Sequence, residues 1–191
     1  MCINKHKFPN KIICNDKRRI LYYSSGYTAS NHDSSVFSRS TIFHQPSRYF
    51  SPGEYLIGDG GYAISPQLIT PYKGRQVLQN AESQFNEVLS SARVTVEHVN
   101  GILKGRWQSL RGLRLVCKKK EDIQFICDWI TCTIILHNLL IDLNDDWAKS
   151  DGWEEDDADS NSGEGDGVLS RTGVEKRERL KEKLIEEGII Y

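Results

Sequence analysis

One stripe of apolar residues in the middle of the chain constrains its fold most strongly. Its members follow one another at alternating steps of four and three residues: Phe85, Leu89, Ala92, Val96, Val99 and Leu103. An α-helix turns once in 3.6 residues, so these positions form one continuous apolar face. We therefore predict a helix over residues 81–110 that lies on a core. A polar stripe beside the apolar one carries Arg93, Glu97 and Lys104.

Short segments rich in β-forming residues predict a sheet for this helix to cover. Residues 11–15 and 20–24 flank a polar turn, as the strands of a β-hairpin do. Residues 54–62 contain a short apolar run that ends on Asp59 and two glycines, the pattern of a buried strand with an acid at its tip. Residues 67–70 are a candidate neighbouring strand. Together with the helix, these segments predict an α/β fold.

A second apolar segment, residues 123–141, is long enough to raise the question of a membrane span. It contains Asp128, His137 and Asn138, which are costly to place inside a bilayer. We therefore interpret residues 122–143 as the last helix of the core and expect no membrane segment. His137 and Asn138 are expected to be hydrogen-bonding groups within that core.

Charge divides the chain into a basic body and an acidic C-terminal part. Residues 1–140 hold 18 Lys and Arg against 10 Asp and Glu, whereas residues 141–191 hold 7 against 16. A basic body predicts a polyanionic partner. Residues 145–167 are rich in Asp, Glu, Ser and Gly, a composition typical of disorder. Residues 173–188 alternate charged residues with Val, Leu and Ile and predict a terminal helix.

Asp59 and Glu97 are the candidate catalytic residues. Asp59 follows a predicted strand, and open α/β sheets place their functional crevice at the carboxyl ends of strands. Glu97 belongs to the long helix that covers the sheet. Because hard cations such as Mg²⁺ and Mn²⁺ take oxygen ligands, two such carboxylates can form part of a metal site. The residues alone leave a structural alternative open, in which Asp59 shapes a turn and Glu97 pairs with Arg93.

Five segments, in this order along the chain, resemble the DDE nuclease domain of PIF/Harbinger transposases and their domesticated relatives. They are SGYTASNHDS at 25–34, YLIGDGGY at 55–62 with LITPY at 68–72, NEVLS at 86–90 with RVTVE at 93–97, GILKGRW at 101–107, and LHN at 136–138. The resemblance covers residues 1–142. It implies an RNase H-like mixed sheet flanked by helices, in which three acids hold two divalent metal ions that cut and join DNA.

The resemblance assigns roles to the acids one by one. Asp59 matches the second Asp of the family and Glu97 its catalytic Glu. The first Asp of the family lies on the first strand, and its motif has no counterpart here, so we expect a domain truncated at its N-terminus that lacks this strand. Asp33, in a recurrent His-Asp-Ser motif after the third predicted strand, is a further candidate metal ligand.

Two functions remain open at this stage. The first is a transposase-derived, metal-dependent endonuclease or strand-transfer domain, impaired by the missing Asp. The alternative is a catalytically inactive DNA-binding or protein-interaction remnant of such a transposase. The expected cofactor is Mg²⁺ or Mn²⁺. The resemblance also implies DNA and a separate DNA-binding protein as partners, and five cysteines without CxxC spacing fit reduced thiols in the nucleus or cytoplasm.

Basic residues around the long helix are the candidate contacts for the DNA backbone. They are Arg93, Lys104, Arg106, Arg111, Lys118, Lys119 and Lys120. Neutralising phosphates with Lys and Arg supplies most of the affinity of sequence-independent DNA binding. The expected organisation is a nuclease domain at 1–142, an acidic linker at 143–172 and a short charged helical tail at 173–191.

Overall fold

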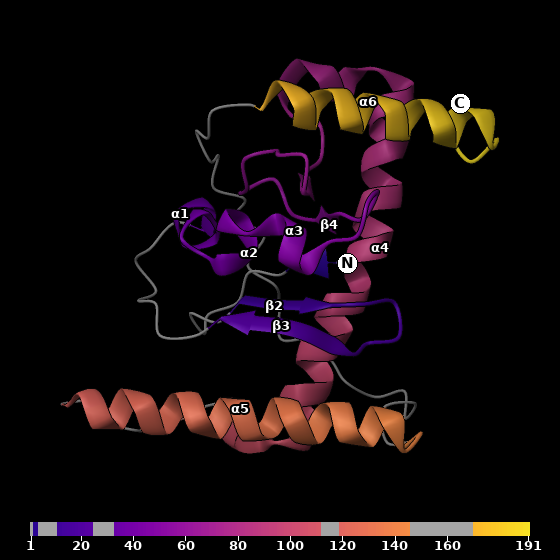
Figure 1. The fold of residues 1–191 in the computed structure, drawn as a ribbon. Coiled ribbons are helices and arrows are strands. Elements are labelled where there is room, and N and C mark those ends of the chain that lie inside the picture. Colours follow the sequence, from indigo (N-terminus) through magenta and orange to yellow (C-terminus); the bar gives the residue numbers. More distant parts are fainter. Residues whose placement is uncertain (1, 4–10, 25–32, 112–118, 146–169) are drawn as a thin grey trace.

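The computed structural model describes residues 2–3, 11–24, 33–111, 119–145 and 170–191 (Figure 1). Five strands form one sheet: β1 (Cys2–Ile3), β2 (Lys11–Cys14), β3 (Ile20–Ser24), β4 (Leu56–Ile57) and β5 (Leu68–Ile69). The helices are α1 (Asp33–Ser38), α2 (Thr41–His44), α3 (Pro46–Tyr49), α4 (Asn80–Arg106), α5 (Lys120–Asp142) and α6 (Arg171–Glu186), with 3₁₀ turns η1 (Gly74–Leu78) and η2 (Gln108–Arg111). The chain is therefore a mixed α/β protein.

The strands are ordered β3-β2-β1-β4-β5 across the sheet. Strand β2 is antiparallel to both of its neighbours, whereas β1, β4 and β5 are parallel to one another. The expectation that the sheet lacks its central strand was wrong. Cys2 of β1 pairs with Cys14 on one side and with Ile57 on the other, so the inner edges of β2 and β4 are joined through β1.

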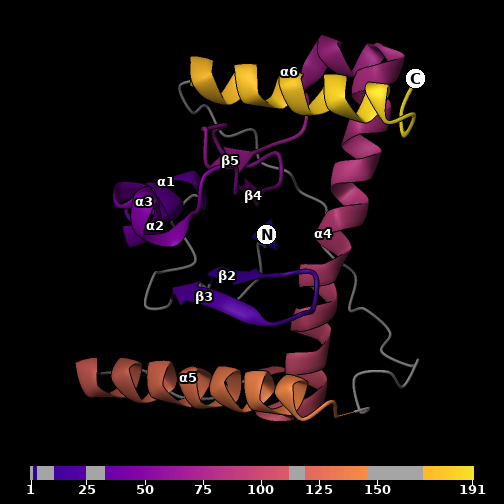
Figure 2. The same ribbon diagram turned by 45° about the vertical axis from the view of Figure 1, so that its right-hand side comes forward.

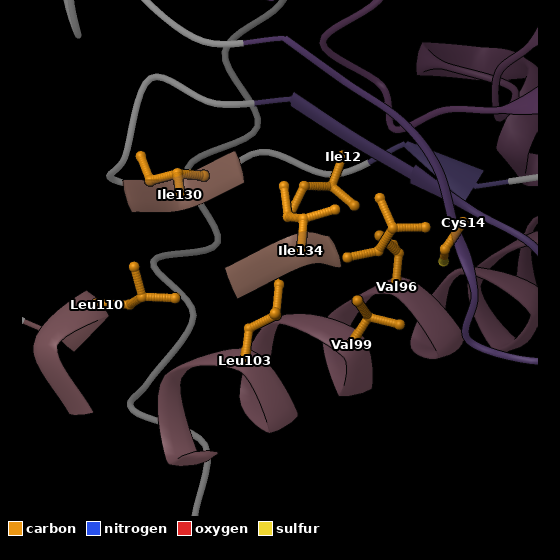
Figure 3. Packing of buried hydrophobic residues seen from close by; sticks show 9 residues of the cluster. Ile12, Cys14, Val96, Val99, Leu103, Leu110, Ile130 and Ile134 are labelled. Carbon is orange, nitrogen blue, oxygen red and sulfur yellow. The ribbon is translucent and has the colours of Figure 1, made fainter. Parts of the chain in front are cut away.

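Strand β2 is buried on both of its faces, because the sheet lies between two parts of the core. Successive side chains of a strand point to opposite faces. Ile12 and Cys14 accordingly pack with Val96 and Val99 of α4 (Figure 3). Ile13 belongs to a different cluster, which holds residues of α1, α2, β4 and β5. Helix α4 thus covers one face of the sheet, and the short helices cover the other.

Helix α4 runs along the whole sheet. The predicted apolar stripe accounts for this helix, because five of its six positions are buried: Phe85, Leu89, Val96, Val99 and Leu103. The helix ends at Arg106, before the predicted boundary, because the backbone of Trp107 leaves the helical region at φ −114° and ψ 84°. Helices α5 and α6 cross α4 at its two opposite ends (Figures 1 and 2).

Helix α5 is less buried than its sequence predicts. Ile130, Thr133, Ile134 and His137 are buried, whereas its opposite face is exposed. In length and apolar composition α5 resembles a membrane-spanning helix, a description that core helices of globular proteins also meet. Its inner face packs with β2 and β3 in the same cluster as α4. The prediction of a core helix therefore holds for one face only.

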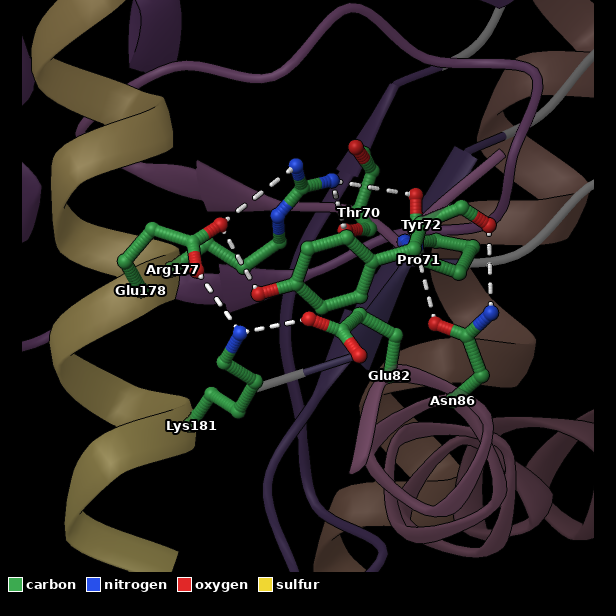
Figure 4. Close-up of polar contacts among 8 residues, drawn as sticks. All are labelled: Thr70, Pro71, Tyr72, Glu82, Asn86, Arg177, Glu178 and Lys181. Atoms are coloured by element: carbon green, nitrogen blue, oxygen red, sulfur yellow. Dashed lines mark hydrogen bonds and ion pairs between the residues drawn. The ribbon is translucent and has the colours of Figure 1, made fainter. Parts of the chain in front are cut away.

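Helix α6 is the terminal helix expected over residues 173–188, and it lies against β5 and the N-terminal half of α4. Arg177 is 5% exposed, stacks 3.8 Å from the centre of the Tyr72 ring and reaches the carbonyl oxygens of Thr70 and Pro71 (Figure 4). Burial, and after it a hydrogen bond to Glu178, raise the pKa of Tyr72 to about 12. Helix α6 is thus held to β5 by polar contacts that are largely buried.

Candidate functional site

Asp59 lies two residues beyond β4, at the carboxyl end of the parallel part of the sheet. The Gly58 N–H donates to the Ile69 carbonyl at 2.9 Å, so pairing with β5 continues almost to Asp59. Asp59 Oδ1 accepts a hydrogen bond of 2.7 Å from the Gly61 N–H, which closes an Asx-type turn. The turn-forming role considered from the sequence is therefore present. The residue is also half-buried.

Glu97 lies on α4 beside Val96, which is fully buried against the sheet. The Glu97 side chain is 37% exposed, and its Oε1 lies 4.0 Å from Arg93 Nη2. An exposed ion pair of this length restrains a carboxylate only weakly. Helix α4 contacts β1 and β4, and Ile57 of β4 packs on the cluster that contains Val96. The strand that precedes Asp59 is therefore in contact with the helix that carries Glu97.

The hypothesis of a metal site of the family's type requires a third acidic ligand. The backbone of Asp33 begins α1, and its side chain lies outside the described residues. Strand β1, in the centre of the sheet, carries Cys2 and Ile3, neither of which is an acid. Within the part of the chain that the structure describes, no three His, Cys, Asp or Glu side chains gather as a metal site would require.

Lys73 lies beside the Asp59 turn, and sequence reasoning did not identify it. A Cβ on Gly60 would lie 3.6 Å from Lys73 Cε and 3.9 Å from Pro71 Cγ. The lysine stem therefore runs past the turn that carries Asp59. No spacing rule connects the two positions, because the segment after β5 meets the segment after β4 only through the parallel pairing of these strands.

Two asparagines from the motifs attach segments of the sheet region to helices. Asn86 of α4 accepts from the Tyr72 N–H at 2.8 Å and donates to the Tyr72 carbonyl at 3.1 Å (Figure 4). Asn138 of α5 makes the same pair of bonds with Ile20, at 2.9 and 2.8 Å. Each amide thus attaches a strand end to a helix. The expectation that Asn138 is a core hydrogen-bonding group is confirmed.

His137 has the same kind of structural role. Its Nε2 hydrogen-bonds the Arg18 carbonyl at 2.9 Å, in the turn between β2 and β3. Burial lowers the pKa of His137, an effect larger than the opposing influence of the Arg18 carbonyl. A neutral ring that donates from Nε2 fits this acceptor. His137 therefore holds the β2–β3 hairpin on α5, and the expectation that it is a core hydrogen-bonding group is confirmed.

The candidate DNA contacts do not form a single basic cluster. Arg106 is largely buried and pairs with Asp145, beyond the C-terminal end of α5. Lys119 and Lys120 are exposed at the N-terminal end of the same helix. A helix of 23 residues is roughly 35 Å long, so these lysines lie far from Arg106. The sequence places these residues near one another, but the helix separates them.

The other basic candidates differ in how far they are exposed. Arg93 and Lys104 are half-buried on α4, and Arg111 is exposed at the end of η2. Lys118 lies outside the described residues. Arg106 also lies 5.8 Å from the centre of the Trp107 ring, a further contact within the chain. Arg111, Lys119 and Lys120 are therefore the exposed members of the predicted set.

Comparisons with known proteins identify relatives of the chain. The family described as DDE superfamily endonuclease matches residues 4–138, more than half of the chain. A relative named "Protein ALP1-like", from Arabidopsis thaliana, is 31% identical over 94 residues, which are 48% of this chain and 21% of that protein. The chain thus matches about a fifth of the length of this relative. No solved structure matches the chain.

Proposed function

The chain belongs to the DDE superfamily endonucleases, and from this premise we propose that it is a transposase-derived domain that binds DNA and cuts or joins it with the help of divalent metal ions. The observation that carries the proposal is the origin of the two candidate acids. Asp59 follows β4 by two residues and Glu97 lies on α4, and β4 and α4 are in contact. This is the position where α/β sheets place functional groups.

The architecture supports an RNase H-like assignment. An antiparallel β2–β3 hairpin extends a parallel β1-β4-β5 core, and helices lie on both faces of the sheet. The proposal of this fold rests on the strand order together with membership of the family.

Asp59 and Glu97 are the residues that would hold Mg²⁺ or Mn²⁺. Their carboxylate oxygens are the donors that these cations prefer. When bound, such ions activate the attacking oxygen and stabilise the leaving oxygen of a phosphodiester. The two acids supply only part of the ligand set of the family, because no third acidic side chain joins them among the described residues.

That shortage favours a second candidate function, a domain that binds DNA and does not cut it. Losing one of three ligands weakens metal binding and leaves charge in the transition state without a counterion. Exposed Arg111, Lys119 and Lys120 would contact phosphates in either case. With DNA as its partner, the chain would act in the nucleus, and a separate protein would supply sequence specificity.

One experiment separates the two functions. Nicking of supercoiled DNA in Mn²⁺ is measured beside DNA binding for the full chain, Asp59→Asn, Glu97→Gln and the control Glu87→Gln, an exposed residue of the same helix. A nuclease loses Mn²⁺-dependent nicking in the first two variants and keeps it in the control. Binding without nicking in any variant supports the second function. Nicking that survives both site substitutions contradicts the assignment of Asp59 and Glu97.

A further inference from the structure

The outward face of α5 carries a regular apolar seam, which we name the α5 seam. Its members are Phe125, Trp129, Cys132, Leu136, Leu139 and Leu143. They follow one another at steps of four, three, four, three and four residues, the spacing of the a and d positions of a heptad repeat. All six are exposed, and the apolar members range from 41% for Trp129 to 67% for Leu143.

The same spacing has a different outcome in α4 and α5. The stripe of α4 is covered by the sheet, as the buried Val96 and Val99 show. The α5 seam lies opposite the face that packs on the hairpin through Ile130 and Ile134. Helix α5 therefore has two apolar faces, and the described chain covers only one of them.

The α5 seam is held in place before any partner arrives. Trp129 Nε1 donates to Ser109 Oγ of η2 at 3.2 Å, and the Phe125 and Trp129 rings lie 6.3 Å apart. On the inner face of α5, Asn138 and His137 are bonded to the hairpin. Binding to such a preformed face costs less conformational entropy than binding to a disordered segment.

The size of the α5 seam fits a dimer interface. Six exposed side chains of these types offer on the order of 500 Å² per chain, and two copies would bury about 1,000 Å² in total, the size of a weak or transient dimer interface. Ile135, 60% exposed, widens the patch beside the α5 seam. The largest apolar patch on a typical soluble monomer is of this size, about 300–600 Å², and is often functional.

We propose that two copies of this chain dimerise by pairing their α5 seams in antiparallel orientation across a two-fold axis. A heptad seam is self-complementary, so one surface can serve both copies. The midpoint of the seam lies between Cys132 and Leu136. In the dimer, Cys132 therefore faces Leu136 of the second copy.

Charge at the ends of α5 favours the antiparallel orientation. The last turn of α5 has no basic residue. Asp142 pairs with Arg19 and Asp145 with Arg106, and their side chains keep 57% and 35% of their surface exposed. Acidic side chains at the C-terminal end of a helix lie beside the negative end of its macrodipole, which is unfavourable unless a positive charge comes near. An antiparallel copy places its own N-terminal turn, with exposed Lys119 and Lys120, beside these aspartates.

The dimer would leave the Asp59 turn open, whereas Lys119 and Lys120 would lie at the edge of the interface. Helix α5 crosses α4 at one end, whereas α6 lies at the other (Figures 1 and 2). The strand that α5 contacts through Asn138 is β3, at the far edge of the sheet from β5. Pairing through α5 therefore buries neither the Asp59 turn nor Lys73.

The first test measures mass in solution by sedimentation equilibrium over a range of concentrations. The full chain is compared with Leu139→Glu in the α5 seam, and with Ile189→Glu as the control. The two positions are matched in exposure, at 50% and 51%. We expect a dimer for the full chain and the control, and a dissociation constant at least about tenfold higher for Leu139→Glu. A dimer that Leu139→Glu does not weaken overturns the proposal.

The second test fixes the orientation by cross-linking. Leu136→Cys is expected to form a disulfide-linked dimer with the native Cys132 of the second copy under mild oxidation, because facing seam positions lie within disulfide distance. The double variant Leu136→Cys, Cys132→Ser is expected to form much less. Equal cross-linking of the two variants refutes the antiparallel register. A monomeric full chain, including one that binds phosphatidylcholine vesicles through α5, overturns the proposal altogether.

Discussion

Gly173, in the first turn of α6, should not tolerate even a methyl group. A Cβ at this position would lie 2.7 Å from the Ser65 carbonyl carbon, 2.8 Å from its Cα and 2.9 Å from its nitrogen. Carbon atoms in contact prefer a separation of about 3.5–4.0 Å. The Gly173→Ala substitution therefore pushes α6 away from the segment before β5, because the atoms it meets belong to the backbone and cannot rotate aside.

Two opposing energies decide the sign of this change. Replacing Gly by Ala in a helix contributes up to about 1 kcal/mol of stability. Overpacking against atoms that cannot move costs about 1–3 kcal/mol. The shift also weakens the buried contacts of Arg177 with Tyr72 and Thr70, one turn further along α6. We therefore expect Gly173→Ala to lower the free energy of unfolding by about 1–2 kcal/mol.

Gly101 provides a matched control within the same chain. It lies inside α4, and a Cβ there would meet no atom within 4 Å. Gly101→Ala should therefore raise the free energy of unfolding, by about 0.5–1 kcal/mol. Urea unfolding followed by far-UV circular dichroism measures both variants. If both substitutions stabilise the protein to the same extent, α6 does not lie on Ser65 as described.

Three further predictions concern the buried polar contacts. Burial lowers the pKa of His137, so on acidification the unfolded chain takes up a proton at this residue before the folded chain does. The free energy of unfolding should therefore fall as pH drops below about 6.5. Urea titrations of His137→Gln should show a flatter pH profile. Asn138→Ala removes both bonds to Ile20 and should cost about 1–3 kcal/mol in urea unfolding; an unchanged midpoint would refute the role of the amide. The hydrogen bond from Lys181 lowers the pKa of Glu82, so this carboxylate contributes stability above its ordinary pKa that is lost on acidification. Glu82→Gln should therefore destabilise the protein at neutral pH more than at pH 3, and an equal loss at both pH values would contradict the reasoning.

The sequence by itself determined the elements whose signal is local. The stripe from Phe85 to Leu103 predicted α4, and the paired β-forming runs predicted the hairpin of β2 and β3. The position of Asp59 beyond a buried strand was also readable from the sequence, because an apolar run followed by an acid and two glycines is a pattern of adjacent residues. The order of motifs identified the family, which the comparisons confirmed.

The tertiary structure alone decided what covers each face and which distant residues meet. Periodicity states which residues share a helix face, but it contains no information on whether a sheet, solvent or a second chain covers that face. For this reason the stripe of α4 is buried, whereas the α5 seam with the same spacing is exposed. Sequence distance misleads in both directions. Lys120 and Arg106 are close in sequence but are separated by the length of α5. Lys181 and Glu82 are 99 residues apart in sequence but form an ion pair of 2.6 Å. Folding fixes such distances, and no local pattern encodes them.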